Sequence, residues 1–91
     1  MNEDIQLQAT PNPNARKFVL PKKVFAQSSN FANAQAAASH PLAQQLFALP
    51  GVYNVFLAQD FVTINKLPDS PWEPLMTKAH TLIAAYWQAL P

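Results

Sequence analysis

The stretch Val52–Asn65 reads V-Y-N-V-F-L-A-Q-D-F-V-T-I-N, and it decides the fold of this chain. Two short apolar runs, rich in β-branched and aromatic residues, flank Gln59-Asp60, and this pattern predicts a β-hairpin. A one-residue slip would turn every side chain to the other face, so the pattern requires a loop of even length, here Gln59-Asp60. The resulting register has one aliphatic face, with the pairs Leu57/Val62, Val55/Ile64 and Tyr53/Lys66. The other face has the pairs Ala58/Phe61, Phe56/Thr63 and Asn54/Asn65.

We expect the aliphatic face of this hairpin to meet the core, which leaves Phe56 and Phe61 on the opposite face. Two helices can cover only one face of so small a sheet. The two phenylalanines are therefore either covered by the N-terminal loop or by Gln27–Asn33, or they form a partly exposed aromatic patch, which is typical of an interaction site. Asp60 is expected to serve the tight turn, because Asp tolerates the left-handed conformation that such a turn needs.

The composition indicates one small globular domain over residues 1–91 and excludes several kinds of chemistry. Hydrophobic residues make up 49% of the chain and its formal charge is +1, so bulk electrostatics favours neither nucleic acid nor a membrane surface. The chain has no cysteine, which excludes disulfides, thiolate metal sites and cysteine nucleophiles within it. Its start is unlike a signal peptide, and no apolar run approaches the ~20 residues that span a bilayer. A cytoplasmic protein is expected.

The N-terminal segment predicts two antiparallel strands joined by a stiff loop. Ile5–Ala9 alternates apolar and polar residues and predicts a half-buried strand, whose inward side chains would be Ile5, Leu7 and Ala9. Ala15–Leu20 predicts the second strand. Between them, Thr10–Asn14 reads T-P-N-P-N, in which Pro11 and Pro13 fix φ and the asparagines can bond to nearby backbone. This loop is either a plain connection or a rigid recognition loop that displays two amides.

Four of the six basic residues lie within eight positions, and they are Arg16, Lys17, Lys22 and Lys23. Such a cluster is typical of a solvated strand edge that prevents sheet–sheet aggregation. Nucleic-acid binding is not favoured, because neither interleaved aromatic residues nor a Gly-rich loop accompany the cluster. Val24-Phe25-Ala26 is a candidate for a short edge strand, and Gln27–Asn33, which is polar, predicts a loop.

Two helices are predicted in the rest of the chain. The first begins at Ser39 or His40 and ends before Pro50-Gly51, which fits the centre of a type II turn with a positive φ at the glycine. One face of this helix carries Leu42, Leu46 and Leu49. The second helix begins after Ser70, which we expect to form a capping box with Glu73. Its apolar stripe should cover the aliphatic face of the hairpin, and it comprises Trp72, Leu75, Met76, Ala79, Leu82, Ile83, Tyr86 and Leu90.

The chain shows no catalytic or metal-binding constellation. Neither of its two histidines, His40 and His80, has a second ligand three or four positions away, the spacing that a helical metal site needs. Ser28 and Ser29 lack the sequence context of an activated nucleophile. The residues therefore predict a binding module and not an enzyme.

Three motifs resemble the N-terminal domain of Nfu/NifU-like iron–sulfur scaffold proteins. They are T-P-N-P-N-A-R-K-F (Thr10–Phe18), H-P-L-A-Q-Q-L-F-A-L-P-G-V-Y-N-V-F-L-A-Q-D-F-V-T-I-N-K (His40–Lys66) and W-E-P-L (Trp72–Leu75). They follow the family's order and extend over most of the chain. Arg16 departs from the family, which usually has an apolar residue there. Members of the family commonly carry a second domain whose C-x-x-C motif holds the cluster, and these 91 residues contain no such motif.

The resemblance implies an accessory, non-catalytic role in iron–sulfur cluster assembly or delivery, without cluster ligands or a cofactor in this chain. The expected fold class is α+β, with a small antiparallel sheet and two main helices packed on one face. The implied partners are cluster assembly or recipient proteins, including a separate scaffold that carries the C-x-x-C motif. The residues expected to contact them are Thr10, Pro11, Asn12, Pro13, Asn14, Lys17, Phe18, Phe56, Asp60, Phe61 and Thr63. The alternative is a peptide-binding module that uses an exposed strand edge and is unrelated to iron.

Overall fold

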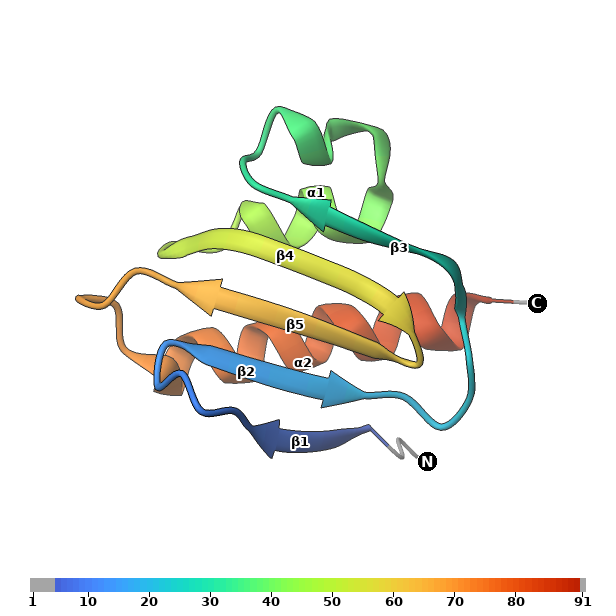
Figure 1. The fold of residues 1–91 in the computed structure, drawn as a ribbon, viewed down its shortest axis with the longest axis horizontal. Coiled ribbons are helices and arrows are strands. Elements are labelled where there is room, and N and C mark those ends of the chain that lie inside the picture. The colour runs from blue at the N-terminus through green and yellow to red at the C-terminus, as the bar shows by residue number, and fades with distance from the viewer. Residues whose placement is uncertain (1–4, 91) are drawn as a thin grey trace.

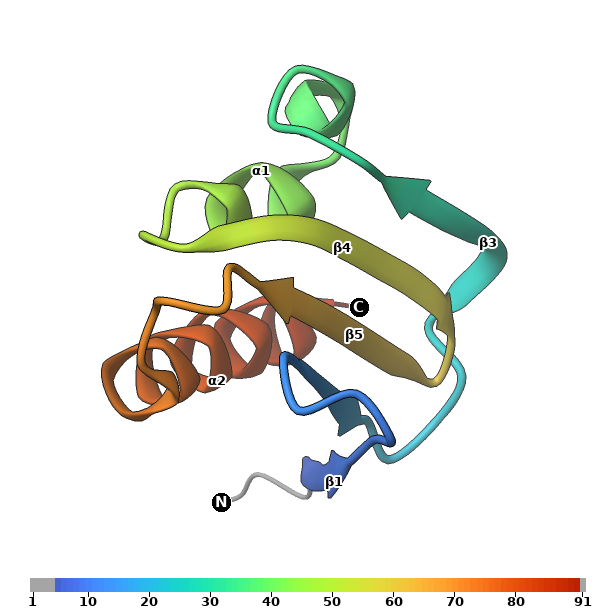
Figure 2. The same cartoon turned by 60° about the vertical axis from the view of Figure 1, so that its left-hand side comes forward.

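The computed structural model describes residues 5–90, which form a sheet layer and a helix layer (Figure 1). In chain order the elements are β1 (Gln6–Ala9), β2 (Ala15–Val19), β3 (Phe25–Phe31), the 3-10 helix η1 (Ala36–Ser39), α1 (Pro41–Phe47), β4 (Val52–Gln59), β5 (Phe61–Lys66) and α2 (Trp72–Ala89). The five strands pair antiparallel in the order β1-β2-β5-β4-β3. Both α1 and α2 lie on one face of this sheet (Figure 2). The predicted α+β class is confirmed.

The central β4–β5 hairpin has the predicted register over most of its length, and its aliphatic face is the centre of the core. The inward pairs are Val55/Ile64 and Leu57/Val62, and the outward pairs are Asn54/Asn65, Phe56/Thr63 and Ala58/Phe61. All four inward side chains are at most 1% exposed. Burial of one such aliphatic side chain contributes about 1.5–3 kcal/mol, so this face accounts for a large part of the driving force for folding.

The start of β4 differs from the prediction. Lys66 pairs with Val52 and not with Tyr53, because a register shift between Val52 and Asn54 inserts one extra residue into β4. Tyr53 is left 45% exposed as a result. Lys66 keeps its predicted place on the helix side of the sheet, where it is buried.

The turn between β4 and β5 consists of Gln59 and Asp60, as predicted, but the left-handed residue is Gln59, with φ of 48°. The N–H groups of Leu20 and Val24 donate to the carbonyls of Asp60 (2.6 Å) and Gln59 (2.8 Å). These two hydrogen bonds hold the turn against the segment between β2 and β3. The surrounding structure therefore maintains a positive φ at a residue that is not glycine.

Both helices contribute buried side chains to the core. The predicted stripe on α2 is confirmed at its centre, where Leu75, Ala79 and Ile83 are buried, and α1 buries Leu42 and Leu46. Within residues 5–90, no helix has the length and apolar character that crossing a membrane requires.

The edges of the sheet depart most from the sequence-based expectation. Leu7 pairs with Phe18 and so faces the helix side as predicted, but it is 48% exposed, and Ala9 is exposed too. The reason is that β1 is the outermost strand, at the margin of the layer that α2 covers (Figure 2). The predicted loop Gln27–Asn33 is wrong for most of its length, because β3 continues to Phe31 and pairs with β4 as the other edge strand.

At the ends of the two helices, some of the sequence-based predictions are confirmed and others are wrong. His40 caps α1 as expected, and Gly51 has φ of 92° as its turn requires. Helix α1 ends at Phe47, however, and so does not extend to Leu49, the residue before Pro50. The predicted capping box of Ser70 does not form, because α2 begins at Trp72 and the Ser70 side chain lies beside Gly51.

Candidate functional site

The Thr10–Asn14 loop is held in one shape by its own hydrogen bonds. Thr10 Oγ1 donates to the Asn12 carbonyl (2.9 Å) and accepts from the Asn12 N–H (3.1 Å). The Asn14 N–H donates to Asn12 Oδ1 (2.9 Å), and the Ala15 N–H donates to the Asn12 carbonyl (3.0 Å). These side-chain turns around two prolines make the loop stiff, as predicted.

Lys66 anchors this loop from inside the molecule. Its ammonium group donates to Asn14 Oδ1 (3.0 Å) and to the carbonyls of Leu67 (3.3 Å) and Pro68 (3.5 Å). The Lys66 N–H also donates to the Asn14 carbonyl (2.8 Å). The side chain is only 5% exposed, and its three acceptors match the three donors of an ammonium group. One buried cation thus joins the loop to the connection between β5 and α2.

Trp72 and Arg16 form a second clamp at the start of α2. Trp72 Nε1 donates to the Pro13 carbonyl (2.9 Å), and an Arg16 guanidinium nitrogen donates to the same carbonyl (3.2 Å). The Arg16 guanidinium carbon lies 4.8 Å from the Trp72 ring centroid, which is a cation–π contact. Arg16, the departure from the family pattern, therefore packs by stacking on an aromatic ring.

The two asparagines of the loop use their side-chain oxygens for hydrogen bonds inside the molecule. The Oδ1 atoms of Asn12 and Asn14 both accept hydrogen bonds from within the fold, so these oxygens serve the shape of the loop. Pro11, Asn12 and Pro13 remain exposed. The loop therefore presents a preformed, proline-rich tip.

The sheet face opposite the helices carries an aromatic pair beside a lysine. The rings of Phe56 and Phe61 have centroids 5.9 Å apart and are tilted by 43°. Lys17 Nζ lies 4.3 Å from the Phe61 ring centroid. Thr63 pairs with both Lys17 and Phe56, so the sheet register brings these four predicted contact residues together. All four are half-buried.

Two other predicted contact residues lie elsewhere. Phe18 is 1% exposed and faces the helices, so it does not lie on the open face with the other predicted contact residues. The alternation of β2 turns Lys17 toward the open face, and the next residue must then point inward. Asp60 lies in the β4–β5 turn, at the end of the sheet away from the Thr10–Asn14 loop (Figure 1).

The histidines are not brought together. His40 caps α1 by accepting the Ala43 N–H at Nδ1 (3.4 Å), and its ring packs with those of Phe25, Phe31 and Tyr86 at centroid distances of 5.8–6.2 Å. This burial lowers the pKa of the His40 imidazole from its ordinary value of 6.5. In the described part of the chain, no group of three or more His, Cys, Asp or Glu side chains is placed to hold a metal ion.

Sequence reasoning missed the clamping roles of Lys66 and Trp72. A signal was present for Lys66, which continues the inward alternation of Val62 and Ile64. A charged side chain at an inward position of a central strand requires buried hydrogen-bond partners. In the structure, these partners come from Asn14 and from Leu67 and Pro68, which follow β5.

The fold and this site together define a class of protein: a small α+β domain with an uncovered sheet face beside a clamped proline–asparagine loop. The chain belongs to the family described as scaffold protein Nfu/NifU N terminal, which it matches over residues 5–89. The resemblance carried by the three sequence motifs is confirmed.

Individual relatives agree with this membership. NifU-like protein 5, mitochondrial, from Arabidopsis thaliana is 37% identical over 86 residues, which are 93% of this chain and 31% of that protein. The human NFU1 iron-sulfur cluster scaffold homolog, mitochondrial, is 46% identical over 63 residues, 68% of this chain and 25% of that protein. The chain thus spans about a third or less of the length of these relatives.

Solved structures agree on the fold. The solution NMR structure of a NifU-like protein from Saccharomyces cerevisiae has a TM-score of 0.83 at 29% identity, over 97% of this chain and 84% of that one. A crystal structure of a Staphylococcus aureus protein, at 24% identity, shares the fold with a TM-score of 0.74, over 87% of this chain and 96% of that one.

Proposed function

We propose that residues 1–91 act as one non-catalytic interaction domain in iron–sulfur cluster assembly or delivery. Family membership supports this proposal, as does the name of the human relative, an iron-sulfur cluster scaffold homolog. The domain contacts proteins that assemble or receive a cluster, including a separate scaffold with a C-x-x-C motif. Because residues 1–91 include no cysteine, the thiolate ligands of the cluster lie outside these residues.

The observation that carries the proposal is the uncovered sheet face with the clamped loop at one end. Strand β5 has six residues, which at about 3.3 Å per residue gives a surface roughly 20 Å long between the loop and Asp60. Small ligands prefer enclosed concave sites, whereas protein partners bind extended surfaces of this kind. Half-buried aromatic side chains such as Phe56 and Phe61 are enriched in protein interfaces.

Lys17 supplies the charge of this surface. Its ammonium group lies over the Phe61 ring, and the other members of the site on the same face, Phe56 and Thr63, are uncharged. We expect the partner to place a carboxylate opposite Lys17 and apolar side chains on the aromatic pair. A charge of this kind fixes orientation and speeds association more than it adds affinity.

The test is capture from the native host by the immobilised chain and by two charge-reversed variants. Lys17→Glu changes the open face, and Lys78→Glu makes the same change at an exposed position on α2, away from that face. We expect the wild type and Lys78→Glu to retain cluster-assembly or cluster-receiving proteins, identified by mass spectrometry, and Lys17→Glu to lose them. Circular dichroism confirms that all three chains are folded. Capture without any iron–sulfur protein, or equal capture by all three chains, would refute the proposal.

The proposed location is the cytoplasm, whereas both named relatives are described as mitochondrial. Fractionation of the native host, followed by detection with an antibody against this chain, decides between the two compartments.

A further inference from the structure

We infer that the outer edge of β1 is a second docking site, which binds an extended acidic segment of a partner protein as an added strand. One apolar side chain of that segment occupies the hollow between β1 and α2. This inference goes beyond the proposed function, because the site uses neither the Thr10–Asn14 loop nor the aromatic pair on the open face.

The first argument is the unprotected edge. Strand β1 is the last strand of the sheet, and within residues 5–90 no strand pairs with its outer side. All four of its residues are exposed, and none is charged or a proline, two of the features that block addition of another strand. The opposite edge is different, because β3 has a register irregularity between Phe25 and Ser29 that interrupts a straight pairing surface.

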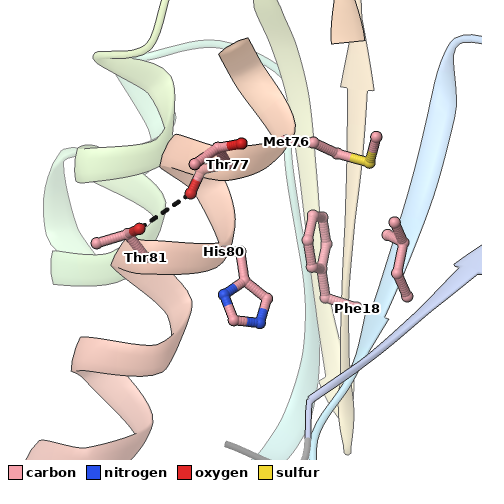
Figure 3. Close-up of a pocket in the computed structure, with 6 residues that line it drawn as sticks. Phe18, Met76, Thr77, His80 and Thr81 are labelled. Carbon is pink, nitrogen blue, oxygen red and sulfur yellow. Dashed lines mark hydrogen bonds between the residues drawn. The ribbon is translucent and has the colours of Figure 1, made fainter. Parts of the chain in front are cut away.

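The second argument is the hollow on the helix side of that edge. It has a volume of about 300 Å³ and is lined by Leu7, Phe18, Met76, Thr77, His80 and Thr81. Figure 3 shows the rings of Phe18 and His80 and the Met76 side chain around this space. An added strand would lie about 4.8 Å beyond β1, and its inward side chains would pack beside Leu7. The hollow therefore holds one apolar side chain of a partner segment in which apolar and polar residues alternate.

The third argument is charge. Residues 5–24 contain four basic side chains, those of Arg16, Lys17, Lys22 and Lys23, and no acidic one. Gln6 pairs with Val19, so the connection that follows β2, with its exposed Lys22 and Lys23, begins beside the start of β1. Acidic side chains of an added strand are therefore attracted to this connection. The acidic residues Glu3 and Asp4 lie outside the described residues.

The test uses a blocked ten-residue peptide in which Glu alternates with Leu and Val, titrated into the ¹⁵N-labelled chain. We expect the largest amide shift changes at Gln6–Ala9 and at 76–81, with slower amide hydrogen exchange in β1. Two control peptides should bind at least about tenfold more weakly. One has Lys in place of every Glu, and the other has N-methyl groups on alternate amides, which prevent strand pairing.

A matched pair of variants locates the site. Leu7 and Tyr53 have nearly equal exposures of 48% and 45%, but Leu7 lies on the edge strand β1 and Tyr53 on β4, three strands away. Leu7→Asp should weaken binding of the acidic peptide about tenfold, and Tyr53→Asp should leave it unchanged. Both changes add the same charge, so a difference between them reports position.

Shift changes centred on β3 or on Phe56 and Phe61, or no binding at millimolar peptide, would overturn the inference. So would equal binding of the Glu and Lys peptides, or equal effects of Leu7→Asp and Tyr53→Asp. The proposed function is tested separately by capture and by Lys17→Glu, a variant that should leave peptide binding unchanged because Lys17 Nζ lies over the Phe61 ring, on the side of β2 away from β1. Loss of one result with retention of the other therefore shows which of the two surfaces was wrongly assigned.

Discussion

The buried contact between Lys66 and Asn14 makes a sharp prediction about the loop. Lys66→Met removes the ammonium group but keeps an unbranched side chain, and Asn14→Ala removes the acceptor. Because Lys66→Met also relieves the desolvation of a buried charge, its own effect on stability combines two opposing terms of several kcal/mol. The coupling energy between the two residues, obtained from both single variants and the double variant, cancels those terms.

We expect a coupling energy of about 1.5–3 kcal/mol, the contribution of a hydrogen bond to a charged group. Two observations support the upper part of this range, namely the 3.0 Å distance from Lys66 Nζ to Asn14 Oδ1 and the 5% exposure of Lys66. Urea unfolding of the four chains, followed by circular dichroism, gives the required free energies. A coupling energy below about 0.5 kcal/mol would show that the cation does not anchor the loop.

The control is a neutral pair in the same sheet. Asn65 Nδ2 donates to Asn54 Oδ1 at 3.5 Å, on the open face, where the bond is only partly buried. A double-mutant cycle with alanine at both positions should give a coupling energy of at most about 0.5 kcal/mol. A value as large as that of the Lys66 pair would mean that charge and burial are not the cause.

Two further predictions concern the turn before β4 and the cap of α1. Gly51→Ala should destabilise the chain by about 2–4 kcal/mol, because φ is 92° and a Cβ would overlap Ser70 Oγ and lie 2.6 Å from Ser70 Cβ. Urea unfolding measures the free energy of unfolding of both chains, and a loss below about 0.5 kcal/mol would contradict the prediction. Because burial lowers the pKa of His40 in the folded state from 6.5, the unfolded state binds more protons just below pH 6.5. Stability should therefore fall as the pH decreases through 6.5, and urea unfolding across this range should show that His40→Gln removes the slope.

Much of the fold is predictable because the hairpin has a strict period of two. A slip by one residue would turn either Val55 and Leu57 or Val62 and Ile64 outward, and the structure has the predicted pairs. The bulge at Tyr53 has no such signature, because a single extra residue near the start of a strand leaves the alternation beyond it intact. The 27–31 part of β3 was missed for a related reason: an exposed edge strand needs no apolar alternation, so its sequence resembles a loop.

The candidate site, too, could be predicted from the sequence only in part. The stiffness of the Thr10–Asn14 loop follows from its prolines and asparagines, and the position of the aromatic pair follows from the hairpin register. The clamps by Lys66 and Trp72 join residues more than fifty positions apart, and local patterns do not report such contacts. Phe18 was assigned to the site as part of a family motif, although the alternation that exposes Lys17 requires its neighbour to be buried.

The strand order also constrains when this chain can fold during synthesis. β2 and β3 follow one another in sequence but are separated in the sheet by β5 and β4. On the ribosome, the first two strands can pair with each other at once, whereas β3 has no partner until Val52–Gln59 emerges. The nascent chain must therefore hold an unpaired strand in water while the next part is translated. The Gln-Ser-Ser-Asn run within β3 suits that delay, because it exposes no apolar side chain to water until the late hairpin inserts and completes the sheet.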